Sequence, residues 1–517
     1  MRKLLIYPLL AAASLMSSCT DDLDQFPRVE TTAADLYQTP EQYESVLAKL
    51  YALYSIAGQE KGGGNADLSS NMGFDFMRIL FNLQEAATDE VASTWLEGDQ
   101  LTNLTYFSWD ANDPWVADMY YRCYYVVTLC NEFLRNATND NISSFDSSSQ
   151  QKLLAYRAEA RFLRAFAYYW VLDLYRKGPL VTENDNVGAY VPSVADAKGL
   201  FDYIESELLD CQSDMLSRTE AVYGRAPRAA AWMLLARLYL NAESYISSPK
   251  YTEAITYSKK VIDEGYQLHA DYRRLFNADN DRRTDEIIYS IVVDAEEVVS
   301  WGASTYLVCG GVSNSSKSAS YNPMDYGVQS GWGSMRARGQ LPSLFETQDK
   351  RALFYTDAQS LSVINPTDQS QGYLVTKWTN LTDDGVAASN TSDGGVNTDW
   401  PVFRLAEAYL ILSEAVLRGG QGATRADAAA VLAKVRSRAG ASEKFESDLS
   451  LDLILDERAR ELFWEGLRRT DLVRFDKFTT SSYLWDLKTG AVAAKYNYYP
   501  IPQAELTANP NLSNPEY

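Results

Sequence analysis

Three tryptophans lie in segments rich in glycine, serine and other polar residues, which are typical of surface loops. Trp95 lies in TWLEG, Trp301 in SWG and Trp332 in SGWGS. A Trp or Tyr ring has a flat apolar face and a polar edge, and so complements the C–H face and hydroxyl rim of a pyranose. An indole exposed on a loop presents apolar area that a ligand would cover. The three residues are candidate sugar-stacking rings, whereas most of the 35 Tyr and 11 Trp are expected to fill the core.

Residues suited to catalysis are few. The chain has one histidine, His269, which excludes histidine-pair metal sites and makes any histidine-based triad depend on it. Glu457, Glu461 and Glu465 recur at steps of four among several arginines. A glycosidase needs two carboxyl groups across a cleft, but like charges at this spacing repel unless cations lie between them. We therefore interpret His269 as a structural or surface residue and the segment 456–475 as an ionic lattice between packed helices.

An oxygen-rich cluster occurs at Asp279, Asn280 and Asp281. Calcium prefers carboxylate and carbonyl oxygens. The spacing of an EF-hand loop is absent because two arginines and a threonine follow. From these residues alone, a solvated turn is the favoured interpretation.

The N-terminus has the layout of a secretory signal. Arg2 and Lys3 precede an apolar run from residue 4 to 15, and two serines stand before Cys19. This pattern predicts a lipoprotein signal peptide over residues 1–18 with acylation of Cys19; the alternative is an ordinary signal peptide with an incidental cysteine. Since no other apolar stretch is long enough to cross a bilayer, we expect a membrane anchor through lipid alone.

The net charge and the cysteines exclude further classes. The formal net charge is −22, so the surface should repel phosphate backbones and nucleic acid is a poor partner. Besides Cys19 there are four cysteines, too few for a disulfide framework. Cys123 and Cys130 are expected on one helix, about 10 Å apart at roughly 1.5 Å per residue, and cannot form a bridge.

Apolar side chains recur at steps of three and four along several segments, which predicts an all-α fold. The helical faces are expected at 158–172, 231–242, 405–415, 429–435 and, as one long charged helix, 454–472. Their mixture of alanines and large residues favours tetratricopeptide-like helical hairpins packed side by side. Between about 296 and 400 the periodicity fails, which predicts a long, irregular, loop-rich insert that bears the ligand site. We expect residues 19–517 to form a single domain.

Several motifs together resemble the SusD/RagB family, and within it the starch-binding members. They are Cys19 with the acidic start after it, AEARFLRA at 158–165, RLAEAYL at 404–410, the charged segment 457–474, YPIP at 499–502 and NP at 509–510. The stretches 302–310, 478–480 and 483–486 are also similar. This resemblance implies a non-enzymatic, cell-surface lipoprotein of the outer membrane. It would capture starch or malto-oligosaccharides and deliver them to a SusC-like TonB-dependent transporter.

The resemblance also implies roles for individual residues. Trp95 and Trp332 match rings that stack on the glycan, and Trp301 stands where a tyrosine is usual. Arg78 is similar to an arginine that hydrogen-bonds sugar hydroxyls, while Gly98 replaces a polar asparagine. Three alternatives stay open: the same role for a different glycan, a helical glycoside hydrolase, and a structural lid that binds no glycan.

A structural calcium ion is implied as well. By resemblance, Asp281, Asn397 and Asp399 would supply its oxygens. Asn397 stands where a carboxylate is usual, so the affinity for the ion is expected to be weaker.

Overall fold

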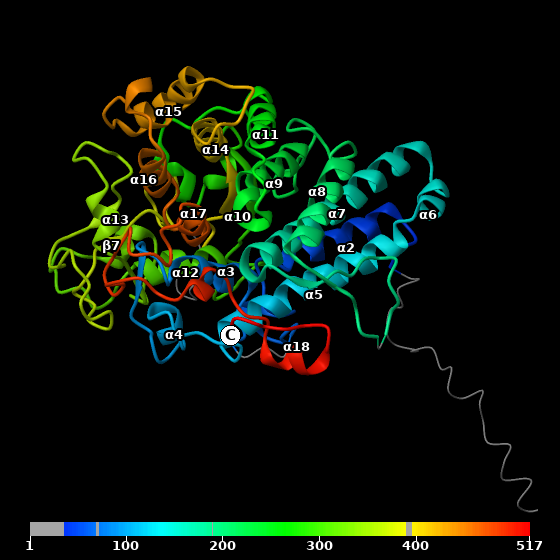
Figure 1. The fold of residues 1–517 in the computed structure, drawn as a ribbon, viewed down its shortest axis with the longest axis horizontal. Helices are drawn as coiled ribbons and strands as arrows, with labels where there is room; N and C mark the ends of the chain where they lie inside the picture. Colours follow the sequence, from blue (N-terminus) through cyan, green and yellow to red (C-terminus); the bar gives the residue numbers. More distant parts are fainter. Residues whose placement is uncertain (1–35, 69–71, 189, 389–394) are drawn as a thin grey trace, which may run out of the picture.

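The computed structural model describes residues 36–68, 72–188, 190–388 and 395–517, and within them the chain is mostly helical (Figure 1). The predicted signal peptide and Cys19 lie outside the described residues. The longer helices are α2 (Pro40–Ala52), α3 (Phe76–Glu85), α5 (Pro114–Asn136), α7 (Ser147–Tyr175), α8 (Ala197–Cys211), α9 (Arg228–Leu240), α11 (Tyr251–Asp263), α12 (Ala303–Gly311), α14 (Leu405–Leu417), α15 (Arg425–Ala439) and α16 (Leu451–Leu462).

Shorter elements connect these helices. The short helices are α4 (Thr102–Thr105), α6 (Asn139–Ser143), α10 (Ala242–Ile246), α13 (Gln340–Ser343), α17 (Arg468–Arg474) and α18 (Gln503–Ala508). The strands are β1 (Val91–Ser93), β2 (Gly178–Pro179), β3 (Val194–Ala195), β4 (Ile287–Ile291), β5 (Met335–Ala337), β6 (Phe354–Tyr355), β7 (Leu374–Val375) and β8 (Trp400–Arg404). They pair antiparallel as β1–β5, β2–β3, β4–β8 and β6–β7.

The helices begin where the sequence supplies capping groups. Asp113 accepts hydrogen bonds from two backbone amides at the start of α5, with Pro114 in the first helical position. Asp146 caps α7 in the same way. Thr424 and Asp427 form a capping box at the start of α15, and Gly440 ends that helix in the left-handed conformation. Such side chains satisfy the amides that a helix leaves unpaired at its first turn.

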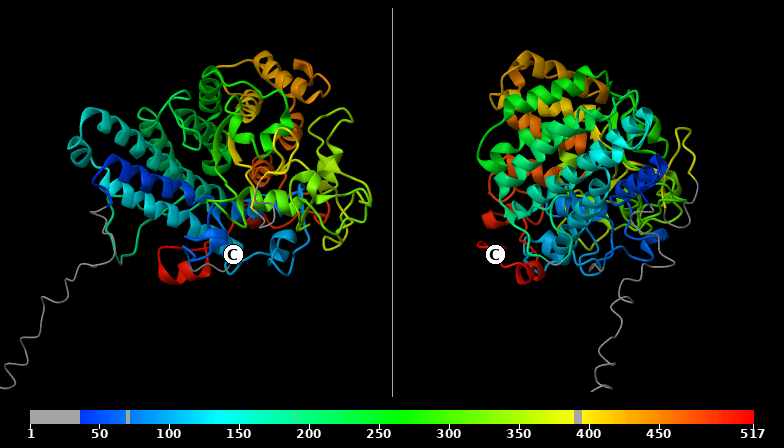
Figure 2. Two further views of the ribbon diagram at one scale, coloured as in Figure 1. Left: turned by 180° about the vertical axis from the view of Figure 1, so that it is seen from behind. Right: turned by 90° about the vertical axis from the view of Figure 1, so that its right-hand side faces the viewer.

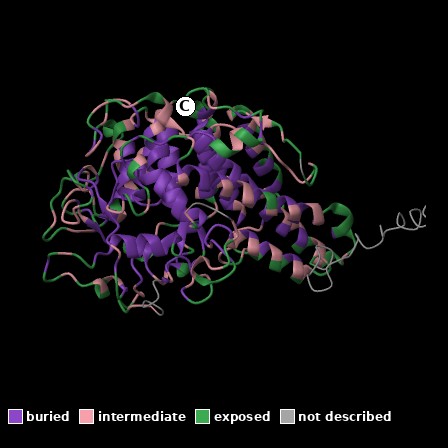
Figure 3. Ribbon diagram, turned by 90° about the horizontal axis from the view of Figure 1, so that it is seen from below, coloured by how far each residue is buried: buried purple, intermediate pink, exposed green. Residues whose placement is uncertain are grey.

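Neighbouring helices pack as antiparallel pairs and build a helical stack. One series of contacts runs from α5 to α7 and from α7 to α8, and a second runs from α9 to α11, from α11 to α14 and from α14 to α15. Figures 1 and 2 show α5, α7 and α8 toward one end and the loop-rich residues between α12 and β8 at the other end. The central helices are the most buried part (Figure 3), and their side chains form a continuous hydrophobic core. The predicted all-α class with helical hairpins is confirmed.

The prediction of one long helix over 454–472 is wrong. Helix α16 ends at Leu462 and α17 begins at Arg468, with Trp464 (φ 59°) and Gly466 (φ 80°) in the left-handed region between them. Partners distant in sequence stabilise this break, because the Glu90 carboxylate accepts the Trp464 amide at 3.0 Å and Glu85 accepts the Leu467 amide at 3.0 Å. The face predicted over 231–242 is likewise divided, since α9 ends at Leu240 and α10 follows.

The insert is loop-rich, as predicted, but it also contains a helix that the periodicity did not indicate. All nine residues of α12 are buried. A helix that is buried on every side has no amphipathic face for the sequence to reveal.

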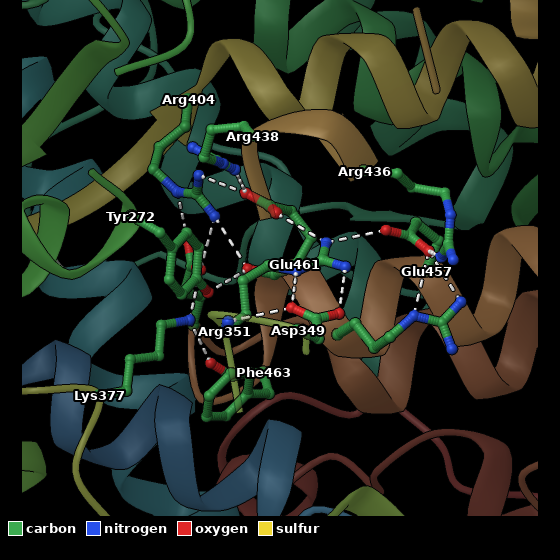
Figure 4. Close-up of polar contacts among 12 residues, drawn as sticks. Tyr272, Asp349, Arg351, Lys377, Arg404, Arg436, Arg438, Glu457, Glu461 and Phe463 are labelled. Carbon is green, nitrogen blue, oxygen red and sulfur yellow. Dashed lines mark hydrogen bonds and ion pairs between the residues drawn. The ribbon is translucent and has the colours of Figure 1, made fainter. Parts of the chain in front are cut away.

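The arginine-rich segment forms a buried ionic network (Figure 4). Arg404 contacts Glu286 at 2.8 Å, Glu461 at 3.0 Å and Glu465 at 2.8 Å. Arg351 contacts Glu461 at 3.0 Å and Glu457 at 2.8 Å. These carboxylates are buried against cations and do not face a cleft, so the predicted ionic lattice between helices is confirmed.

The histidine and the cysteines are structural in this fold. The Nδ1 atom of His269 lies 2.8 Å from a carboxylate oxygen of Asp285. Cys123 and Cys130 are free, buried thiols on α5, and burial raises the pKa of Cys130 to about 12. Within the described ranges, each helix is too short or too polar to cross a lipid bilayer.

Candidate functional site

The fold brings the three predicted tryptophans together. The ring centroids of Trp95 and Trp332 are 6.0 Å apart with an interplanar angle of 27°, and those of Trp301 and Trp332 are 6.3 Å apart at 50°. Trp301 is 43 % exposed, and the other two rings are half-buried. We call Trp95, Trp301 and Trp332 the tryptophan platform; Trp332 is its centre.

Two paired strands position Trp95 and Trp332. Strand β1 pairs with β5, with Ser93 opposite Met335, so that both tryptophans leave the same end of this small sheet. The Thr94 amide donates to the Ser334 carbonyl at 2.8 Å, and the Thr94 hydroxyl to the Gly333 carbonyl at 2.9 Å. These two hydrogen bonds fasten the residue before Trp95 to the two residues after Trp332, and so hold the two indoles side by side.

The glycines around Trp332 permit close approach of two backbone segments. The Trp332 amide donates to the Cys309 carbonyl at the end of α12, and the Gly333 amide to the Val312 carbonyl, each at 2.7 Å. A Cβ atom on Gly331 would lie 2.2 Å from that same carbonyl oxygen. The sequence SGWGS thus fits a tight loop that presses against α12.

Trp301 is held by a turn that only glycine allows. A Cβ atom on Gly302 would lie 1.6 Å from an oxygen of Asp75. The same Asp75 carboxylate accepts the amides of Arg78 and Ala303, at 3.0 and 3.1 Å. One buried carboxylate therefore joins the start of α3 to the start of α12, beside Trp301.

Arg78 lies beneath the platform and is 3 % exposed. Its guanidinium donates to the Trp301 carbonyl at 2.9 Å and to Asp99 at 2.7 Å. The group is stacked between the rings of Phe74, 3.5 Å from the centroid, and Tyr306, 4.2 Å from the centroid. Arg78 therefore links the backbone of Trp301 to Asp99, which lies beside Trp95. Its Nε–H has no hydrogen-bond partner among the described residues.

Three of these neighbours were not predicted from sequence. The Asp99 amide donates to the Trp95 carbonyl, which brings its carboxylate to the platform edge. Burial raises the pKa of Asp99, and the nearby Arg78 charge opposes that rise. Phe74 and Tyr306 reach the site from the starts of α3 and α12, and nothing in their spacing indicates that these two rings, 232 positions apart, enclose one guanidinium group.

The predicted calcium ligands line one depression of about 600 Å³. Asp399 is 3 % exposed and accepts the Val293 amide at 2.8 Å and the Tyr223 hydroxyl. Asn397 accepts the Ala295 amide at 3.0 Å. Burial raises the pKa of Asp399 to about 7, and the charge of Asp281 adds to the rise.

Hard oxygen donors of this kind fit calcium. These three residues supply only two carboxylates. In the part of the chain that the structure describes, no group of three or more acidic, histidine or cysteine side chains could hold a metal ion.

Comparison with known proteins gives consistent results. A sequence profile of the SusD family matches residues 346–517. The starch-binding protein SusD of Bacteroides thetaiotaomicron is 34 % identical, covering 98 % of this chain and 96 % of that protein. A SusD-like protein of Bacteroides ovatus is 25 % identical over 93 % of this chain and 84 % of its own length.

Solved structures show the same fold. Surface glycan-binding protein A from Bacteroides uniformis superposes with a TM-score of 0.71 at 22 % identity, covering 92 % of this chain and 99 % of that chain. The corresponding protein from Bacteroides thetaiotaomicron, in complex with laminarihexaose, has a TM-score of 0.70 at 20 % identity, covering 93 % and 100 %. The chain therefore belongs to the SusD family of non-catalytic, carbohydrate-binding proteins.

Proposed function

We propose that the protein captures starch-like α-glucan and malto-oligosaccharides on the tryptophan platform. The observation that carries this proposal is the inclination of neighbouring rings. The interplanar angle is 27° between Trp95 and Trp332 and 50° between Trp332 and Trp301. Rings that are inclined to one another suit a sugar chain that curves, as an α-1,4-glucan does. The 34 % identity to a starch-binding relative over nearly the whole chain supports the same ligand class.

We propose that glycan capture at the cell surface is the first step of glycan import. Acylation of Cys19 would hold the protein at the outer surface of the outer membrane. The bound glycan would then pass to a SusC-like TonB-dependent transporter. The signal-like N-terminus and the family support this role.

Affinity electrophoresis of the protein without its first 19 residues tests the ligand. Native gels would contain amylopectin, laminarin, levan or xylan. We expect retardation by amylopectin and little by the others. Retardation by laminarin alone would assign the platform to a β-glucan, which one structural relative binds. Retardation by none would favour the structural lid without glycan affinity.

We also propose that Asp281, Asn397 and Asp399 hold a structural calcium ion. The support is their shared depression and the clustering of Asp281 and Asp294 charge near Asp399, which a divalent cation would neutralise. When bound, the ion would tie the 3₁₀ turn Asn280–Arg282, before β4, to the segment before β8.

Calcium is expected to raise the melting temperature by about 1 °C per kcal/mol of stabilisation in a chain of this size, because a ligand that binds the native state stabilises it. Differential scanning fluorimetry in EDTA and in calcium chloride measures the shift. Asp399→Asn should abolish it, whereas Asp452→Asn, at an exposed position, should retain it. An equal melting temperature with and without calcium would contradict the site.

A further inference from the structure

A second group of aromatic rings lies in the insert, between α12 and β7. The ring centroids of Tyr321 and Tyr326 are 5.5 Å apart with an interplanar angle of 31°, and those of Tyr321 and Tyr355 are 4.8 Å apart at 72°. Tyr326 ends a single 3₁₀ turn that begins at Pro323, and Tyr355 belongs to β6. We call Tyr321, Tyr326 and Tyr355 the tyrosine cluster.

The tyrosine cluster is only half-buried, unlike the aromatic groups of the core. All three rings have intermediate exposure, whereas the core pair Trp378 and Trp400 are each 1 % exposed. Rings that served only to fill the interior would be covered in the same way. Part of each tyrosine ring is thus open to solvent.

Polar groups surround the tyrosine cluster. The Tyr355 hydroxyl lies 2.9 Å from the exposed Ser320 hydroxyl and 2.5 Å from that of Ser318, which donates to Asp357 at 2.6 Å. The Tyr326 hydroxyl has no hydrogen-bond partner within residues 36–68, 72–188, 190–388 and 395–517. Open rings bordered by hydroxyl and carboxylate groups match both the apolar face and the polar rim of a sugar.

One short segment connects the tyrosine cluster to the tryptophan platform. The Ser313 amide donates to the Tyr321 hydroxyl at 3.1 Å. The preceding residue, Val312, accepts the Gly333 amide at 2.7 Å, and the following residue, Asn314, accepts the Gly331 amide at 2.8 Å. Three consecutive residues therefore hold Tyr321 on one side and both glycines that flank Trp332 on the other.

We propose that the tyrosine cluster is a second sugar-binding platform, which engages the same glucan chain beyond the tryptophan platform. This inference rests on the proposed function, because it assumes that glucan occupies the tryptophans. Two linked sites make the second contact intramolecular, so a polymer long enough to reach both binds more tightly than a short oligosaccharide. The tyrosine cluster would thus select for chain length.

The test compares a polymer with a short ligand. Affinity gels measure binding to amylopectin, and calorimetry measures binding to maltotriose, which has one glucose unit for each ring of the tryptophan platform. Tyr326→Ala should weaken amylopectin binding by about tenfold and leave maltotriose binding unchanged, which also shows that the variant is folded. Tyr326→Phe keeps the ring and removes an unpartnered hydroxyl, so it should behave as the wild type.

Tyr190→Ala is the matched control, because this tyrosine is 37 % exposed on the loop between β2 and β3, outside both platforms. Unchanged amylopectin binding by Tyr326→Ala would overturn the second platform alone. Equal weakening for both ligands would also overturn it, because maltotriose on the tryptophans does not need the tyrosines. Absence of amylopectin binding by the wild type would instead overturn the proposed function and, with it, this inference.

Discussion

Replacing Trp332 with alanine is expected to weaken amylopectin binding by about thirtyfold or more while the protein stays folded. Trp332 is the central ring: its centroid lies 6.0 Å from that of Trp95, 6.3 Å from that of Trp301 and 6.4 Å from that of Tyr306. Its removal both deletes one stacking surface and withdraws support from its neighbours. Affinity electrophoresis with graded amylopectin concentrations measures the change.

Two variants separate stacking from a general loss of structure. Trp332→Phe retains a smaller ring and should bind with intermediate affinity. Trp232→Ala removes a half-buried indole on α9, whose Nε1–H donates to Gln212, and should bind as the wild type does. Wild-type affinity in Trp332→Ala, with an unchanged circular dichroism spectrum, would show that the glycan binds elsewhere.

Replacing Glu461 with alanine is expected to lower the free energy of unfolding by about 3–5 kcal/mol. Glu461 is fully buried and contacts Arg404 at 3.0 Å, Arg351 at 3.0 Å and also Arg438. Without it, three buried guanidinium groups share too few carboxylates, and an uncompensated buried charge is costly. Urea denaturation followed by tryptophan fluorescence measures the loss.

Asp452→Ala is the control for this prediction, because Asp452 pairs with Lys477 at 3.0 Å but is 78 % exposed. Exposed ion pairs contribute about 0–1 kcal/mol, so this variant should unfold near the wild-type midpoint. Equal midpoints for Glu461→Ala and the wild type would contradict a stabilising role for the buried ionic network.

The pH dependence of the Glu461 effect has a defined sign. Burial alone would raise the pKa of Glu461, but the charges of Arg438, Arg404 and Arg351 outweigh it and lower the pKa to about 2. A depressed carboxyl pKa stabilises the folded state above the unfolded value of about 4.3, and this contribution is lost as the pH falls toward the folded pKa. The difference in the free energy of unfolding between the wild type and Glu461→Ala should therefore become smaller below about pH 4.

Much of the helical stack could be predicted from the sequence because local signals suffice for it. Helices α7 and α14 cover the predicted faces at 158–172 and 405–415. The break between α16 and α17 could not be predicted, since it depends on Glu85 and Glu90, more than 370 positions earlier. Helix α12 was missed because it is buried on every side.

The candidate residues of the site came from the sequence, and their proximity in space came from the structure. Glycine and serine neighbours indicated loops for Trp95, Trp301 and Trp332, and the family resemblance added Arg78. Only the fold shows that α3, β1, α12 and β5 bring these residues together, with Arg78 beneath the rings. The tyrosine cluster had no sequence signal, because its members are three of 35 tyrosines.

The most direct test of the account is a crystal structure of the protein with maltoheptaose. We expect glucose rings stacked on Trp95, Trp332 and Trp301 at van der Waals distance, about 4 Å from the indole carbons. The chain should curve as it passes from one ring to the next. An oligosaccharide ordered on another surface, with the three indoles left uncovered, would contradict the assignment of the tryptophan platform as the glycan site.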